Sequence, residues 1–163
     1  MEPNHAYQPI AARGEFHAAL RAAFAEAAAQ GYREILLCDP DFADWPLNEP
    51  ALIDALVRGA AAHRRLTVLA RGFDEFTRRH ARWLAWRQTW SHLVECRANN
   101  ELEAGQMPTL LLMPGLLTLR MVDMEHYRGS VSRAAADAVR AREQFDAVVQ
   151  RSEEAFPVTN LGL

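Results

Sequence analysis

The sequence predicts one α/β domain, in which a mixed sheet of parallel strands and an antiparallel hairpin is flanked by helices on both faces. The chain has 163 residues, of which 50% are hydrophobic and 24% are charged. This is the size and mixture of one globular domain with a sizeable core. Up to residue 97, helical periodicity alternates with short apolar runs, a pattern typical of parallel strands joined by crossover helices. Residues 107–130 then hold two apolar runs joined by Pro114-Gly115, which predicts a hairpin.

The first half of the chain alternates helices with short strands. Residues 1–14 hold two prolines and little periodicity, so we expect an extended lead-in. Apolar residues at helical spacing predict a helix over 15–30 that ends at Gly31. Pro50 favours the first position of the next helix, and Gly72 ends the second strand. The predicted strands of this half are 34–38, 66–70 and 93–97, and a third helix is predicted over 73–86.

The second half is dominated by the hairpin. Residues 109–113 are apolar without a break, which predicts a strand in the middle of the sheet and buried on both faces. The returning arm alternates in polarity. Residues 127–131 predict a short last strand, and residues 134–154 have the periodicity of a long helix. The tail over 155–163 is apolar, so we expect it to pack on the protein surface.

Composition excludes several functions. All 18 basic residues are arginine, so mechanisms that need a lysine ammonium group are excluded. The formal charge of −3 gives no general attraction to nucleic acid or to a membrane. Cys38 and Cys96 lie in apolar runs, which favours buried thiols in a reducing compartment. No stretch is long enough to span a bilayer and no signal pattern opens the chain, so we expect a cytoplasmic protein. No motif predicts a cofactor.

An acidic loop follows the first predicted strand, a position where α/β proteins usually bind ligands. Asp39, Asp41 and Asp44 could bind a cation or an arginine of a partner, and Trp45 could form an aromatic platform. The spacing differs from that of a calcium loop, so turn chemistry is the preferred interpretation and no metal is predicted. His92, just before the third strand, is a candidate to join this loop at the carboxyl edge of the sheet.

The third helix combines arginine with tryptophan, a pattern that suits phosphate contact and base stacking. Acidic neighbours such as Glu75 and the absence of a basic excess argue against nucleic-acid binding. Trp83 and Trp86 are expected to face the core and the arginines to face water. The candidate binding residues are Arg78, Arg79 and Arg82, followed by Arg87 and interleaved with Trp83, Trp86 and Trp90.

The order of elements resembles one half of the phospholipase D superfamily fold. The segments LLCDPDFADWPL, ARWLAW with SHLVEC, RGSVSR and TNLGL also resemble a bacterial family of small uncharacterised proteins. In the superfamily, a strand carries His-x-Lys with an Asp four residues later, and the His attacks phosphorus. Here Met107, Thr109 and Pro114 stand in place of that His, Lys and Asp, so these three are degenerate active-site positions. A thioether cannot act as an imidazole nucleophile, and the chain has no lysine.

The resemblance therefore implies a phospholipase-D-like binding or scaffolding domain that has lost catalysis. Active members of the superfamily place two halves face to face, which implies a homodimer here, and a protein partner is a further candidate. Two alternatives stay open. One is an enzyme of another class that uses the acidic loop and His92. The other is a nucleic-acid-binding module that uses the arginine and tryptophan helix over residues 78–90.

Overall fold

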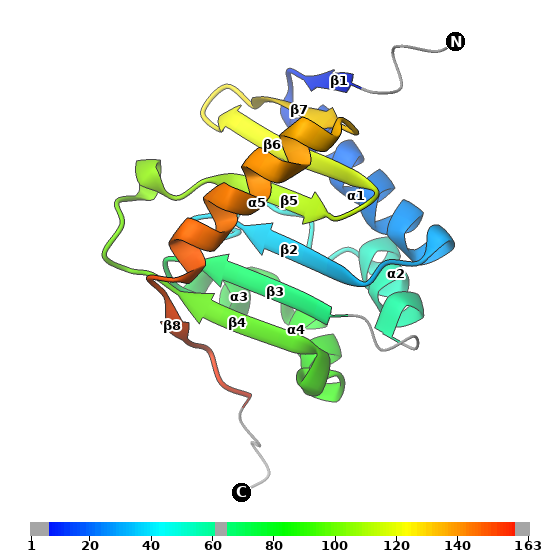
Figure 1. The fold of residues 1–163 in the computed structure, drawn as a ribbon. Coiled ribbons are helices and arrows are strands. Elements are labelled where there is room, and N and C mark those ends of the chain that lie inside the picture. Colours follow the sequence, from blue (N-terminus) through cyan, green and yellow to red (C-terminus); the bar gives the residue numbers. More distant parts are fainter. Residues whose placement is uncertain (1–6, 61–64, 159–163) are drawn as a thin grey trace, which may run out of the picture.

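The computed structural model describes residues 7–60 and 65–158, and within them eight strands form one sheet covered by helices on both faces (Figure 1). The strands are β1 (Tyr7–Ile10), β2 (Glu34–Cys38), β3 (Arg65–Ala70), β4 (Val94–Ala98), β5 (Thr109–Met113), β6 (Leu117–Asp123), β7 (Arg128–Ser132) and β8 (Glu153–Glu154). The α-helices are α1 (Arg13–Gln30), α2 (Pro50–Ala60), α3 (Asp74–Arg79), α4 (Ala81–Thr89) and α5 (Ala135–Val149). Short 3-10 turns occupy Ser91–Leu93 and Ala104–Gln106.

The sheet is mixed, as the sequence predicts. Its order is β1-β7-β6-β5-β2-β3-β4-β8. Strands β2, β3 and β4 are parallel, and β5 is antiparallel both to β2 and to β6. The predicted hairpin is therefore β5–β6, and it lies in the middle of the sheet. Because β5 runs against β2, the start of β5 lies beside the carboxyl end of β2.

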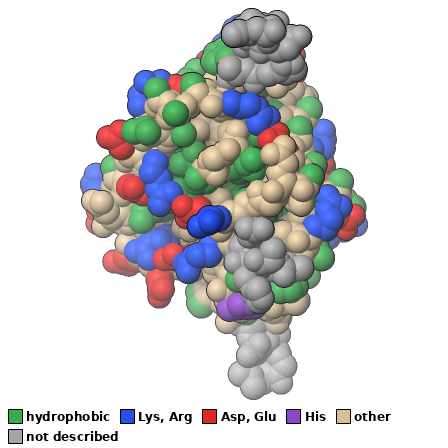
Figure 2. Space-filling view, turned by 45° about the vertical axis from the view of Figure 1, so that its right-hand side comes forward, with side chains coloured by type: hydrophobic (Ala, Val, Ile, Leu, Met, Phe, Trp, Pro, Cys, Tyr) green, Lys and Arg blue, Asp and Glu red, His purple; other side chains and the backbone are tan. Residues whose placement is uncertain are grey.

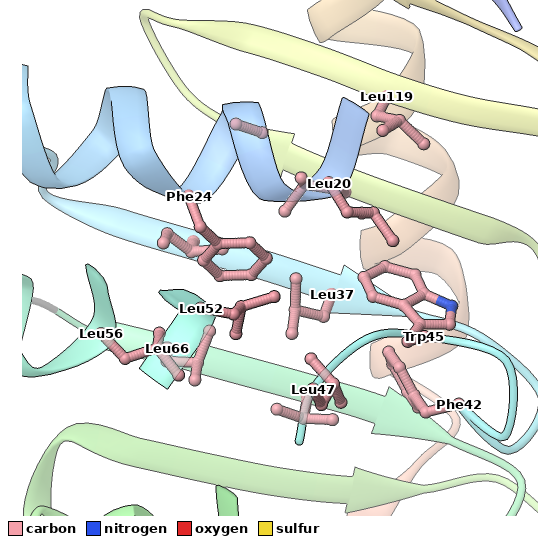
Figure 3. Packing of buried hydrophobic residues seen from close by; sticks show 14 of the residues in the cluster. Leu20, Phe24, Leu37, Phe42, Trp45, Leu47, Leu52, Leu56, Leu66 and Leu119 are labelled. Carbon is pink, nitrogen blue, oxygen red and sulfur yellow. The ribbon is translucent and has the colours of Figure 1, made fainter. Parts of the chain in front are cut away.

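The two faces of the sheet carry cores of unequal size. Figure 1 shows α5 across one face, with the other four helices behind the sheet. Neighbouring residues of β2 serve opposite cores, since Leu37 belongs to the larger cluster and Leu36 to the cluster beneath α5. Every residue of β5 is buried, which confirms the predicted two-sided burial. Figure 3 shows the larger cluster, where Phe24 and Leu52 of the helices meet Leu37 of the sheet.

Several local signals have the predicted effect. Gly31 caps α1 with φ of 83°, a backbone conformation that glycine adopts without strain. Pro50 is the first residue of α2. Cys38 and Cys96 are both free and buried, and burial raises the pKa of each thiol, that of Cys96 to about 12.

The structure corrects three boundaries. The lead-in contains β1, which covers the edge of β7. The helix predicted over 73–86 is divided at His80, whose backbone leaves the helical region with φ −123° and ψ 50°. The helix predicted over 134–154 ends at Val149, and β8 follows it and pairs with β4. The strand predicted over 127–131 is β7, which covers Arg128–Ser132.

The start of the tail packs on the protein through Phe156, whereas Pro157 and Val158 are exposed. The ring of Phe156 stacks on that of Phe73, with centroids 5.0 Å apart and an interplanar angle of 9°. The rest of the predicted tail, residues 159–163, lies outside the described residues. Across the described ranges, none of the helices combines the length and the apolar character that a bilayer-spanning segment needs.

Candidate functional site

A pocket of about 640 Å³ lies where the carboxyl end of β2 meets the start of β5. The antiparallel topology brings the carboxyl end of β6 to the same edge, so three strands contribute to one rim. Helix α5, which covers one face of the sheet, adds the side chain of Gln144. The lining residues are Asp39–Asp41, Ala43, Asp44, Ala104–Thr109, Arg120–Met124 and Gln144.

Asp39 is the buried centre of this pocket. Its side chain is 5% exposed, and one carboxylate oxygen accepts a hydrogen bond from Thr109 Oγ1 at 2.5 Å. The other oxygen accepts the backbone N–H groups of Asp41 at 3.1 Å and Phe42 at 2.7 Å. Burial raises the pKa of Asp39, and these hydrogen bonds oppose the rise. Asp39 therefore fixes the loop, including Phe42, whose φ is +60°.

Asp44 joins three parts of the chain rather than capping the loop. Its carboxylate accepts hydrogen bonds from Arg13 Nε at 2.9 Å and from the Tyr127 hydroxyl. His17 Nε2 lies 2.6 Å from the Asp44 carbonyl oxygen, so the ring donates to it. Burial acts to raise the pKa of Asp44, but the bonds from Tyr127 and Arg13 outweigh it and the pKa is lowered. The loop is thus tied to α1 and to the β6–β7 turn.

The other two loop candidates differ in exposure. Asp41 is exposed, and within the described residues its carboxylate accepts one hydrogen bond, from the Ala43 N–H at 2.9 Å, so it can reach a ligand. Trp45 is 3% exposed and its ring packs 4.8 Å from that of Phe42. Trp45 is therefore a core residue and presents no open platform. Among the residues that the structure describes, no three His, Cys, Asp or Glu side chains form a group that could hold a metal ion.

The three degenerate positions do not stay together. Met107 and Thr109 line the pocket beside the acidic loop, and Met107 Sδ lies 3.4 Å from Cys38 Sγ. Pro114 follows β5, at the opposite end of that strand, and does not line the pocket. The pocket therefore lies next to the two positions at the start of the strand.

His92 does not meet the acidic loop. It precedes β4, whereas Asp39 follows β2, and these two strands point in the same direction. The two side chains are therefore at opposite edges of the sheet. His92 lines a separate cavity of about 630 Å³, together with Arg87.

The arginine and tryptophan segment is divided between surface and core. Arg78 and Arg79 both pair with Glu75, at 3.5 and 2.7 Å. Arg82 donates to the Asn48 carbonyl oxygen at 3.1 Å. Trp83 and Trp86 are buried, as predicted, but so is Arg87, which was expected among the surface arginines. In Figure 2, basic and acidic side chains are interspersed on the face shown.

Four polar residues of the pocket are not candidates on sequence grounds: Gln106, Arg120, Asp123 and Gln144. Gln144 comes from α5, and its side-chain oxygen is buried without a hydrogen-bond partner among the described residues. Arg120 comes from β6, and the alternation of that strand was the one signal that could separate it from its apolar neighbours. Nothing in the local sequence connects Gln144 or Arg120 with the acidic loop.

Two solved structures are similar to this fold. The crystal structure of Nuc from Salmonella typhimurium, a phospholipase D family member, has a TM-score of 0.59 and 8% identity. The similarity covers 93% of this chain and 98% of that one. TrmBL2, an archaeal chromatin protein described as showing a novel mode of DNA binding, has a TM-score of 0.65 and 15% identity, over 94% of this chain and 55% of that one. At these identities, the similarity establishes the mixed α/β fold with a phospholipase-D-like neighbour.

Comparison with curated proteins finds no match. A family model, in contrast, covers most of the chain. It is described as a domain of unknown function, DUF7931, and it matches residues 17–161, a range that includes the acidic loop, the β5–β6 hairpin and α5. The chain therefore belongs to the DUF7931 family.

Proposed function

We propose that this chain is a non-catalytic, phospholipase-D-like binding domain whose pocket takes a ligand that donates hydrogen bonds, such as a small amine. The observation that carries the proposal is the composition of the pocket between the acidic loop and β5. Its lining contains four aspartates and a single arginine, Arg120. Asp44 and Asp123 pair with Arg13 and His126, so the remaining excess of acid is Asp39 and Asp41 against Arg120. This excess disfavours a phosphodiester and favours a cation.

The chemistry of the start of β5 also argues against phosphoryl transfer. Met107 offers a thioether, and the hydroxyl of Thr109 donates to Asp39. No histidine is among the described residues that line the pocket, and no lysine occurs in the chain. The groups that would attack phosphorus and neutralise the phosphoryl oxygens are therefore missing.

Two acceptors are placed to bind the ligand. Asp41 is exposed at the pocket rim, and the buried oxygen of Gln144 has no donor within the described structure. A buried acceptor without a partner is unfavourable, and an ammonium or amide N–H would satisfy it.

We expect small amines such as agmatine and putrescine to bind in calorimetric titrations, while bis(p-nitrophenyl) phosphate is hydrolysed no faster than in buffer. Asp41→Asn should weaken amine binding by about 1.4-fold to fivefold, because an exposed ion pair contributes about 0.2–1 kcal/mol. Glu143→Gln, which removes one exposed carboxylate from α5 away from the pocket lining, is the matched control. Tighter binding of the phosphodiester than of any amine would contradict the proposal.

We also propose that the domain is a homodimer, with the pocket edges of two copies facing each other. The side chain of Val122 supports this arrangement, because it lines the pocket and is 77% exposed. The β5–β6 hairpin itself is inside the sheet, so it offers no free edge for pairing. Light scattering should give twice the chain mass, and Val122→Glu should shift the protein toward monomer. Val57→Glu, at another exposed valine, is the control.

Nucleic-acid binding is a second proposal. The similarity to TrmBL2 favours it, and Arg78, Arg79 and Arg82 would be the contacts. Their engagement with Glu75 and Asn48 reduces the free positive charge of this segment. The third possibility, an enzyme that combines the acidic loop with His92, loses its basis because these groups lie at opposite edges of the sheet.

A further inference from the structure

Arg87, in the last turn of α4, is a buried cation for which the described residues offer no counter-ion. It is 7% exposed, and within the described part of the chain it makes no hydrogen bond or ion pair. Its Nε is fully buried without a partner. The contact made by its guanidinium is with the ring of Phe156, whose centroid is 5.0 Å from Cζ. Buried charges in proteins are normally paired, because an unpaired one is strongly unfavourable.

Arg87 lines the second cavity of about 630 Å³, which lies beside β4 and the segment that follows β8, and also a smaller one of about 260 Å³. Arg65 and His92 line the larger cavity and add further donors. Cys96 also lines this cavity; burial raises the pKa of its thiol, and the positive charge of Arg87 opposes the rise. The cavity is therefore lined by basic groups on several sides.

The acidic residues of the cavity do not neutralise Arg87. Glu95 pairs with Arg97 at 2.9 Å and approaches Arg65 at 4.0 Å. Glu154 is exposed and has no ion pair among the described residues. Within the described residues, the buried guanidinium is thus left without an anionic partner and is available to a ligand.

We propose that this cavity is an anion-binding site, in which Arg87 holds a carboxylate or phosphate group of a small organic ligand. A guanidinium presents two parallel N–H groups that match the paired oxygens of either anion. The volume exceeds the space that an inorganic anion fills and is within the range of cavities that hold small organic ligands. The site is separate from the acidic pocket and opposite in charge, so it does not rest on the function proposed for that pocket.

Thermal unfolding of the full chain at constant ionic strength tests the site with inorganic phosphate, sulfate, citrate and succinate. At least one of these anions should raise the Tm. Comparing phosphate and sulfate with citrate and succinate shows whether the site prefers a phosphate-like anion or a carboxylate. Arg87→Met should weaken the preferred anion roughly tenfold to a hundredfold, because a hydrogen bond to a charged group contributes about 1.5–3 kcal/mol. Without anion, this variant should be at least as stable as the parent, since it removes an unpaired buried charge.

Arg58→Met is the matched control, because Arg58 is exposed in α2 and has no partner among the described residues. It should bind anions like the parent. If Arg87→Met does not fold, Arg87→Lys keeps the charge but loses the paired N–H groups, and it should still weaken binding. The proposal would be overturned if none of the anions stabilised the parent, or if the anions stabilised the Arg87 variants as much as the parent.

Discussion

Replacing Trp83 with alanine is expected to lower the free energy of unfolding by about 3–5 kcal/mol, the usual range for removing a large buried aromatic side chain. Trp83 has no exposed surface. Its ring lies 4.9 Å from that of Phe76 and 6.0 Å from that of Trp86. The truncation would leave a large cavity between α3, α4 and the sheet. Guanidinium unfolding followed by circular dichroism measures the change.

Trp83→Phe is the informative partner of this variant. Phenylalanine keeps most of the ring contacts and removes the indole N–H, which is buried without a hydrogen-bond partner among the described residues. We therefore expect a smaller loss than for alanine. In a mobility-shift assay with duplex DNA, Trp83→Phe should behave like the parent, because a fully buried ring cannot stack on a base. An alanine variant of parental stability with altered DNA binding would contradict this assignment.

The central part of the fold is predictable because its signals are local. The uninterrupted apolar run of β5 can only be stable when both faces are covered, and this placed the hairpin inside the sheet. Gly31 and Pro50 act through their own backbone preferences, so the ends they define needed no tertiary information.

The peripheral elements were missed because their stability comes from partners that are far away in the sequence. Strand β1 is exposed except for Ile10, and it forms by pairing with β7. Strand β8 has two residues and pairs with β4. The division between α3 and α4 has a similar origin, because His80 Nε2 lies 2.8 Å from the Phe42 carbonyl oxygen. No local pattern contains these contacts.

The candidate site shows the same division. Asp39 and Asp41 were found because they directly follow a strand end, and the carboxyl ends of strands predict loop sites. Gln144 reaches the pocket only through the packing of α5, and Arg87 differs from its exposed neighbours only in its tertiary burial. His92 was placed at the wrong edge, because residues that precede and follow parallel strands lie on opposite edges.

Asp39→Ala is expected to lower the free energy of unfolding by about 2–4 kcal/mol. The substitution leaves the Thr109 hydroxyl and the N–H groups of Asp41 and Phe42 without their acceptor, and unsatisfied buried donors are costly. The loop at the pocket should loosen as well, because Phe42 is held at positive φ by this acceptor. Urea unfolding measures the loss, and an unchanged midpoint would contradict it.

The pH dependence of the free energy of unfolding distinguishes the effect of the carboxylate charge of Asp39 from the effect of its hydrogen bonds. Burial raises the folded-state pKa of Asp39 above its unfolded value. Its contribution to stability is therefore fully present below the unfolded pKa and is lost as the pH rises through the folded pKa. The side chain in Asp39→Asn does not titrate. The difference in free energy of unfolding between the parent and this less stable variant should therefore shrink as the pH rises across that window. A difference that grew with pH would contradict the raised pKa.

Thr109→Val should show the opposite trend. The hydroxyl of Thr109 donates to the Asp39 carboxylate and lowers its pKa, so it stabilises the ionised form. Without this donor the pKa of Asp39 rises further, and ionisation becomes more costly in the folded state. The loss in free energy of unfolding caused by Thr109→Val should therefore be small where Asp39 is protonated and larger above the folded-state pKa of Asp39. Opposite pH slopes for two residues in one hydrogen bond distinguish a charge held at the pocket from simple loss of packing, because a cavity changes stability equally at every pH.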